Sequence, residues 1–167
     1  AGVGSPLRAF AKTRQDLASP DVLLGLVPLF IDPPGRWGLK IAKQNGISMY
    51  AHAISPASTG HVHIKSADPR QAPAITFNFL AEEIDRQLTV KALKLTRDIM
   101  MAPAMAPLKL KEWGPGAEAQ TDEALLQYAM NTGDTTYHPV GTCKMGVDDM
   151  AVVDPRLKVR GLEGLRV

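Results

Sequence analysis

The sequence predicts an α+β fold in which an antiparallel or mixed sheet is flanked by helices. Short apolar or alternating segments that end at Pro, Gly or Asp fill the first half of the chain, a pattern typical of strands joined by turns. In the second half, apolar residues recur every three or four positions, as in an amphipathic helix. Strands that precede helices, without regular alternation of the two, favour α+β over a parallel α/β sheet.

Three or four strands are expected before the first helix. Residues 21–30 (DVLLGLVPLF) are a continuous apolar run of strand length, which predicts a strand buried on both faces. The Asp32–Gly35 turn (DPPG) is expected to end it. Residues up to about Ser19 show no pattern from which an element is predicted. The other strand candidates are the apolar segment 47–54 and the alternating segments 60–66 and 74–79.

Two helices are expected after the strands. One apolar stripe runs along the first helix, which Pro103 ends, and consists of Ile84, Leu88, Ala92, Leu95 and Ile99. Thr121 is expected to cap a second helix that extends to about Met130. The charged residues of the first helix are interpreted as a solvated face, and they are Glu82, Glu83, Asp85, Lys91, Lys94, Arg97 and Asp98.

Composition sets limits on the class of protein. The 167 residues suit one ordinary domain, and 19 basic against 17 acidic residues give no electrostatic case for nucleic acid or an anionic membrane as a partner. No apolar run approaches the roughly 20 residues that span a bilayer. The single cysteine, Cys143, excludes an internal disulfide and fits a reducing compartment, so a cytoplasmic location is expected.

Both ends of the sequence suggest a fragment. The chain begins at Ala1 without a methionine, and residues 161–167 (GLEGLRV) are expected to form a turn that enters a strand. The sequence therefore predicts a piece of a longer protein, truncated at both ends.

The segment 137–146 (YHPVGTCKMG) holds the main candidate for a functional residue. Pro139 excludes the helical region for His138 and pins its backbone in an extended or turn conformation. An imidazole changes charge near neutral pH and can accept or donate a proton during a reaction. Two interpretations remain open from the residues alone: His138 is catalytic, or it is a turn histidine bonded to backbone.

The other candidates have simpler interpretations. His61 and His63 point to one face of a strand, but without a third ligand near them they are interpreted as an exposed hairpin face, and no metal site is predicted. His52 is expected to be partly buried. Cys143 with His138 as its base would be a thiol catalyst, but a small buried hydrophobic residue is the preferred interpretation. The sequence contains no G-x-G-x-x-G, so the chain itself holds no Rossmann dinucleotide site.

Several segments resemble one known family. Residues 137–146, followed by 151–154 (AVVD) and 161–167, closely resemble the C-terminal signature of the glucose–methanol–choline (GMC) oxidoreductases. Residues 58–69 resemble the S-x-G-x-V-x-L-x-S-x-D-P strand and turn of that family, and residues 74–78 resemble its P-x-I-x-x-N segment. The resemblance extends in order over nearly the whole chain.

The resemblance implies a role within a flavoenzyme. Residues 1–167 would be the substrate-binding domain, with the FAD-linked reductase C-terminal fold, of a choline-dehydrogenase-like enzyme whose N-terminal Rossmann-type FAD domain is absent here. The histidine at the place of His138 would take or help to take the hydroxyl proton of an alcohol while hydride passes to FAD. Tyr137, Pro139 and Val140 would line the flavin side of the cavity. FAD is expected in the full-length protein and not on this fragment.

Two departures from the family pattern matter. The second catalytic residue of the family, a His or Asn, would follow Val167. Gly25 stands where choline-type members carry a histidine, which argues against choline as the substrate and leaves another alcohol open. The alternative function is a non-enzymatic α+β interaction module in which His138 is structural.

Overall fold

The computed structural model describes residues 7–32 and 40–167, and it divides into two compact units. Unit 1 lies within Ala1–Thr59 and Asn78–Asp134, and unit 2 comprises Gly60–Phe77 and Thr135–Val167. Both helices and antiparallel strands are present, which confirms the predicted α+β class. Most of the turn expected at Asp32–Gly35 lies outside the described residues.

A three-stranded antiparallel sheet is the centre of unit 1. Its strands are β1 (Leu7–Ala11), β2 (Val22–Val27) and β5 (Ser48–Ala53), in the order β1-β2-β5. In the central strand, Leu24 pairs with Ala9 on one side and with Ala51 on the other. All residues of β2 are buried or half-buried. These strands confirm the candidates at 21–30 and 47–54, whereas β1 was not predicted because its mostly exposed residues show no apolar pattern.

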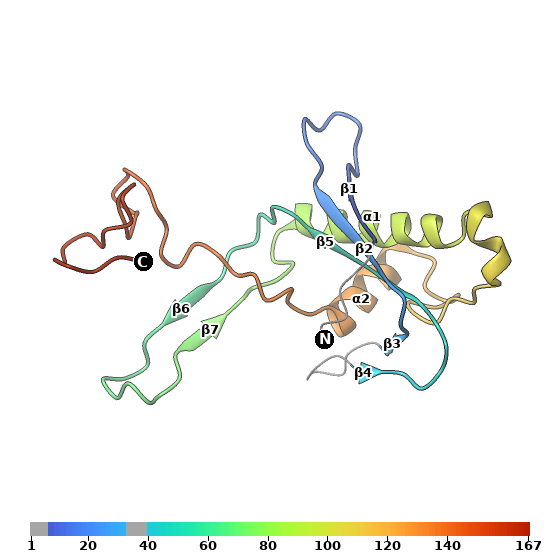
Figure 1. Cartoon of the computed structure of the whole chain (residues 1–167), viewed down its shortest axis with the longest axis horizontal. Helices are drawn as coiled ribbons and strands as arrows, with labels where there is room; N and C mark the ends of the chain where they lie inside the picture. The colour runs from blue at the N-terminus through green and yellow to red at the C-terminus, as the bar shows by residue number, and fades with distance from the viewer. Residues whose placement is uncertain (1–6, 33–39) are drawn as a thin grey trace. The chain divides into compact units, whose positions relative to one another are not determined.

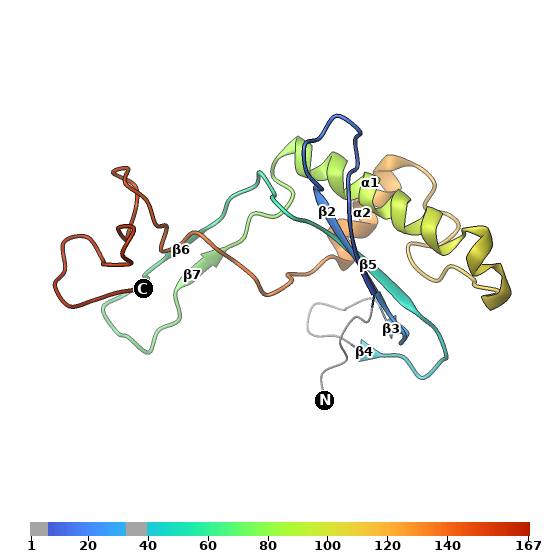
Figure 2. The ribbon, with the colours of Figure 1, turned by 45° about the horizontal axis from the view of Figure 1, so that its top comes forward.

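The helix α1 (Glu83–Met100) packs on one face of this sheet, and Figures 1 and 2 show it running alongside the strands. Val22 and Leu24 of β2 are buried together with Ala92 of the helix. The partly buried residues around them are Ala11, Met49, Ala51, Leu88 and Leu95. The middle of the predicted apolar stripe therefore forms the core, while its end residues, Ile84 and Ile99, are exposed.

A second helix, α2 (Asp122–Thr132), packs beside α1. Thr121 caps it as predicted, since its hydroxyl accepts a hydrogen bond from the Ala124 amide at 3.2 Å. Leu125 is buried against Val90 of α1, so α1 uses one face for the sheet and another for α2. Among the described residues, no helix is long and apolar enough to cross a membrane.

The remaining elements are short. In unit 1, β3 (Ile31–Asp32) pairs with β4 (Lys40–Ile41), and a 3-10 helix, η1 (Pro103–Leu108), follows α1. In unit 2, β6 (His61–His63) and β7 (Ala74–Thr76) form a two-stranded hairpin, shorter than the predicted segments 60–66 and 74–79.

The C-terminal part of unit 2 consists of turns and isolated bridges. The strand expected within 161–167 is wrong, because the structure has only an isolated bridge there, between Arg166 and Lys158. The two turns of this segment, with Gly161 and Gly164 at positive φ, leave no extended stretch long enough for a ladder.

Asp85 corrects the expectation of a solvated helix face. Its side chain is only 4% exposed, and its carboxylate accepts hydrogen bonds from the amides of Ala57 at 2.9 Å and Ser58 at 2.6 Å. Ser58 in turn accepts a hydrogen bond from the Glu82 amide at 3.1 Å through its hydroxyl. Glu82 is the N-cap position of α1 and makes no side-chain cap itself. Together these hydrogen bonds fix the 57–58 backbone on the start of α1.

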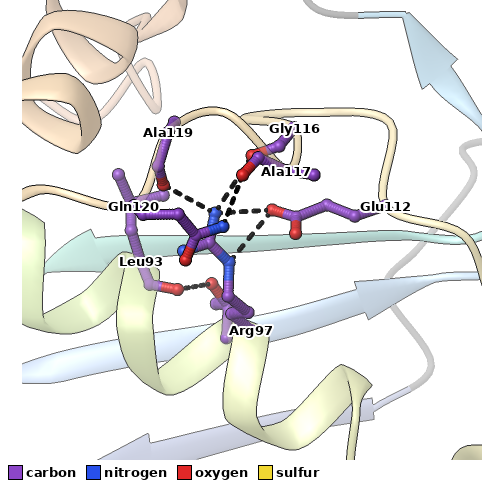
Figure 3. A network of polar contacts seen from close by, with 8 residues as sticks. Leu93, Arg97, Glu112, Gly116, Ala117, Ala119 and Gln120 are labelled. Atoms are coloured by element: carbon purple, nitrogen blue, oxygen red, sulfur yellow. Dashed lines mark hydrogen bonds and ion pairs between the residues drawn. The ribbon is translucent and has the colours of Figure 1, made fainter.

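Arg97 is the second correction to the solvated face, and Figure 3 shows its surroundings. Its guanidinium donates to Glu112 from Nε at 3.1 Å and from Nη2 at 2.9 Å, and both side chains are mostly buried. Nη2 also donates to the carbonyls of Ala119 at 3.1 Å and Gly116 at 3.4 Å. This one side chain therefore ties the 112–119 loop to α1.

The Asp85 contact generates a prediction on stability and pH. Burial raises the pKa of Asp85, but hydrogen bonds from Ser58 and Ala57 outweigh it and hold the pKa below its ordinary value of 3.8. The contribution of the carboxylate is therefore complete above about pH 4 and is lost as the pH falls through the lower, folded-state pKa. Asp85→Ala should lower the free energy of unfolding at pH 7 by about 1.5–3 kcal/mol, measured by urea unfolding with circular dichroism.

The exposed Asp98 of the same helix provides the control. Asp98→Asn should change the free energy of unfolding by less than about 0.5 kcal/mol. An equal loss of unfolding free energy in both variants would show that the buried carboxylate does not stabilise unit 1. The same conclusion would follow if the stability of Asp85→Ala fell in acid as the wild-type stability does.

The Arg97 network generates a second prediction. Arg97→Ala should destabilise unit 1 by about 1–3 kcal/mol and speed hydrogen exchange in residues 112–119, because a half-buried glutamate and two carbonyls lose their donor. Lys94→Ala is the control, since Lys94 pairs with Asp122 on the surface, where such pairs contribute at most about 1 kcal/mol. Similar exchange rates in the two variants would contradict the role of Arg97.

Candidate functional site

The predicted site lies on the segment 135–141, which forms no helix or strand. The Tyr137 amide donates to the Thr135 hydroxyl at 3.0 Å, and Tyr137 has a φ of 60°, in the left-handed region. Gly141 has a φ of 99°, which a residue with a side chain adopts only with strain. Between these two positions, Pro139 fixes its own φ and restricts His138. Sharp turns on both sides thus define the backbone around the candidate histidine.

All four predicted site residues are exposed. Val140 is 93% exposed, and Tyr137, His138 and Pro139 are also exposed. The four are near one another because they are consecutive in the sequence. The loop is therefore an open surface on which a partner group can lie.

The chain that follows the loop is anchored by backbone hydrogen bonds. The carbonyl of Lys144 accepts from the amides of Val152 at 2.8 Å and Val153 at 3.2 Å, and Val153 is buried. Arg160 donates to the carbonyls of Gly146 at 3.0 Å and Asp148 at 2.7 Å. The C-terminal side of the His138 loop therefore joins a well-connected group of turns.

Asp148 and Lys144 form an exposed ion pair within these turns. The Lys144 ammonium lies 3.0 Å from the Asp148 carboxylate and holds the pKa of that carboxyl below its ordinary range. At the surface such a pair contributes little to stability, so the backbone contacts are the main anchor.

Cys143 departs from its preferred interpretation. It was expected to be a small buried hydrophobic residue, but it is exposed, because it lies in the turn at residues 142–143. In the part of the chain that the structure describes, no hydrogen bond joins Cys143 to His138. The arrangement therefore gives no support to a Cys–His pair.

The other histidines lie as predicted. His61 and His63 occupy the same face of β6, exposed, with ring centroids 4.8 Å apart. Residues 7–32 and 40–167 contain no group of three His, Cys, Asp or Glu side chains that could hold a metal ion. His52 is half-buried and stacks on Tyr50, with ring centroids 6.1 Å apart.

One contact near Gly25 was missed from the sequence. Gly25 of β2 pairs directly with Tyr50 of β5, and a Cβ at position 25 would lie 2.2 Å from the Tyr50 ring. The phenol ring therefore crosses the glycine and fills the space that a side chain there would need. Only the strand register reveals the pair, and the sequence alone does not set that register.

A hollow of about 190 Å³ lies at the end of α1, apart from the predicted site residues. Its lining consists of Met100, Met101, Ala102, Met105, Ala106, Lys109 and Leu110. None of the candidate catalytic or cofactor-binding residues contributes to it.

Comparison with known proteins gives one consistent result. The family model described as GMC oxidoreductase matches residues 56–167. Oxygen-dependent choline dehydrogenases of Escherichia coli strains K12 / DH10B and UTI89 are 42% identical to the chain over 158 residues, which is 95% of the chain. The chain spans 28% of the length of these relatives.

Solved structures agree on the fold. Pyridoxine 4-oxidase from Mesorbium loti superposes with a TM-score of 0.82 at 23% identity, over 95% of this chain and 31% of that one. A variant of formate oxidase from Aspergillus oryzae RIB40 gives 0.73 at 26% identity, over 90% and 26%. A fungal aryl-alcohol oxidase gives 0.67 at 26% identity, over 89% and 23%.

The open position of Cys143 generates a prediction. In the folded 167-residue chain, a thiol reagent should label Cys143 completely, at a rate within about 3-fold of the rate in urea, because access does not limit the reaction. Mass spectrometry of timed samples measures both rates. Protection of the folded chain by 10-fold or more would place Cys143 in the interior and contradict the described geometry.

Proposed function

The chain belongs to the GMC oxidoreductase family, and we propose that it is the substrate-binding and catalytic part of an FAD-dependent enzyme that oxidises the CH–OH group of an alcohol. The observation that carries the proposal is the segment 137–146, which lies inside the region matched by the family model and presents His138 on an open loop. The activity belongs to a longer protein, of which these 167 residues form the substrate-binding domain.

We propose His138 as the catalytic base. A neutral imidazole can take the hydroxyl proton of the alcohol as the hydride leaves the adjacent carbon. Removal of this proton avoids positive charge on the carbon and leaves a carbonyl product. The restrictions that Pro139 and the left-handed Tyr137 impose on the backbone support a fixed direction for the imidazole.

The neighbours of His138 suit contact with a flavin. Tyr137, Pro139 and Val140 are exposed on the same loop, with an aromatic ring and two apolar side chains that can lie against a planar ring system. When bound, FAD supplies the acceptor for the hydride. The chain has no phosphate-binding glycine motif, so the proposed partner is an N-terminal FAD domain of the same protein. The 167-residue chain alone is expected neither to retain FAD nor to turn over.

The substrate is proposed to be an alcohol other than choline. The two relatives named above are choline dehydrogenases. By the family resemblance, Gly25 stands where choline-type members carry a histidine, and the Tyr50 ring lies across it. Different side chains at these two positions would present a different surface to a substrate.

No observation on this chain supports the two alternative functions, a non-enzymatic interaction module and a thiol enzyme. A non-enzymatic module would not require the family segment around His138, and a thiol enzyme would require a base in contact with Cys143. Family membership and the exposed, unpaired geometry of Cys143 both favour the flavoenzyme.

The role of His138 generates a prediction for the full-length protein. His138→Ala should slow anaerobic flavin reduction by alcohol by about 10²–10⁴-fold, the usual contribution of a general base. Stopped-flow absorbance of the flavin measures the rate, and the FAD content of each preparation is measured alongside. His63→Ala and Cys143→Ser serve as controls and should keep the rate within about 2-fold. An unchanged rate in His138→Ala with normal FAD content would remove the assignment.

A further inference from the structure

The β6–β7 hairpin has one apolar face and one polar face. Val62 pairs with Ile75 across the hairpin, and Ile64 continues the alternation one residue beyond β6. These three residues are named here the apolar hairpin face. The neighbouring positions carry His61, His63 and Thr76, which point to the opposite side. The two sides of one short element therefore differ sharply in chemistry.

The apolar hairpin face is open in the described structure. Val62 is 46% exposed, Ile75 is 56% exposed and Ile64 is 88% exposed. Within unit 2, the described hydrophobic residues that are fully buried are Ala151 and Val153, and neither belongs to the hairpin. An isolated two-stranded hairpin is marginally stable in water and needs further strands or another layer on its apolar face. This hairpin therefore lacks the layer that would stabilise it.

The ends of the hairpin are held in place. Directly outside the hairpin, the Asn78 side chain donates to the Thr59 carbonyl at 3.2 Å and so joins the two segments that flank it. At Gly60 the strands approach so closely that a Cβ would lie 2.1 Å from the Thr76 carbonyl oxygen.

An exposed ion pair lies near the tip of the hairpin. Arg70 donates to both carboxylate oxygens of Asp68 at 3.0 Å. Because the pair is at the surface, it contributes little, and the contacts at the base of the hairpin are the main restraint on its two strands.

The length of the relatives indicates what covers this face. The chain spans 28% of the choline dehydrogenases that it matches, so most of such a protein lies outside it. A second copy of the chain is a poorer candidate, because stable contacts between separate proteins bury roughly 1,200 Å² or more, which three side chains do not supply. A contact within one polypeptide does not pay the entropy of association and can be smaller.

We infer that the apolar hairpin face is a docking surface for the part of the same protein that lies outside this chain. This inference rests on the proposed function only in requiring a longer parent protein. Docking would bury Val62, Ile64 and Ile75 and stabilise the hairpin, while leaving His61 and His63 on the outer side.

Hydrogen exchange of the full-length protein and of the 167-residue chain tests the inference directly. Amides of β6 and β7 should exchange at least about 100-fold more slowly in the full-length protein, because the covered hairpin opens only rarely. Amides of α1 should be protected in both, since its core lies within this chain. Equal exchange of the hairpin amides in the two proteins would overturn the inference. Protection in the 167-residue chain that rises with its concentration would assign the face to a second copy, and would also overturn it.

Matched variants in the full-length protein test which face of the hairpin is covered. Val62→Asp and Ile75→Asp should speed exchange of the hairpin amides by about 10-fold or more, because each places a carboxylate in an apolar contact. His63→Asp and Thr76→Asp, on the opposite face of the same strands, should change it by less than about 2-fold. Equal effects on both faces would contradict the docking surface.

Wild-type flavin reduction by alcohol is measured on the same full-length preparation. Absence of that reaction with normal hairpin protection would reject the proposed function and leave the docking surface standing.

Discussion

The buried carboxylate of Asp85 is the contact on which the arrangement of unit 1 depends. It accepts hydrogen bonds from the Ala57 and Ser58 amides, while the Ser58 hydroxyl accepts one from the amide of Glu82, the N-cap residue of α1. This exchange joins the start of the helix to a segment 28 positions earlier in the chain. Because α1 also covers the sheet and carries the Arg97 network, one anchored helix start positions the sheet and the 112–119 loop.

Sequence patterns predicted the elements that depend on residues close together in the sequence. The apolar run of β2, the stripe of α1 and the Thr121 cap all depend on residues within a few positions of one another, and the structure confirms them. Strand β1 was missed because its exposed residues show no alternation. Asp85 and Arg97 were misjudged as solvated, because their partners lie 15 to 28 positions away and long-range contacts leave no local signal.

At the candidate site, too, local features were predictable from the sequence and long-range contacts were not. His138 is proposed from its local motif and from the family resemblance, and the structure adds an open loop with a left-handed Tyr137. The walls of a substrate cavity could not be predicted from local patterns, because such walls come from several segments. The contact of Tyr50 with Gly25 was likewise visible only once the register of β2 and β5 was known. The exposed loop and the apolar hairpin face are both explained by a protein that supplies their missing surfaces.

The most direct test of the alcohol-oxidising flavoenzyme is a kinetic isotope effect on anaerobic flavin reduction by the full-length protein. An alcohol deuterated at the carbon that bears the hydroxyl group should bleach the flavin several-fold more slowly than the undeuterated alcohol, because the C–H bond breaks in that step. A flavin that no alcohol reduces would contradict the account.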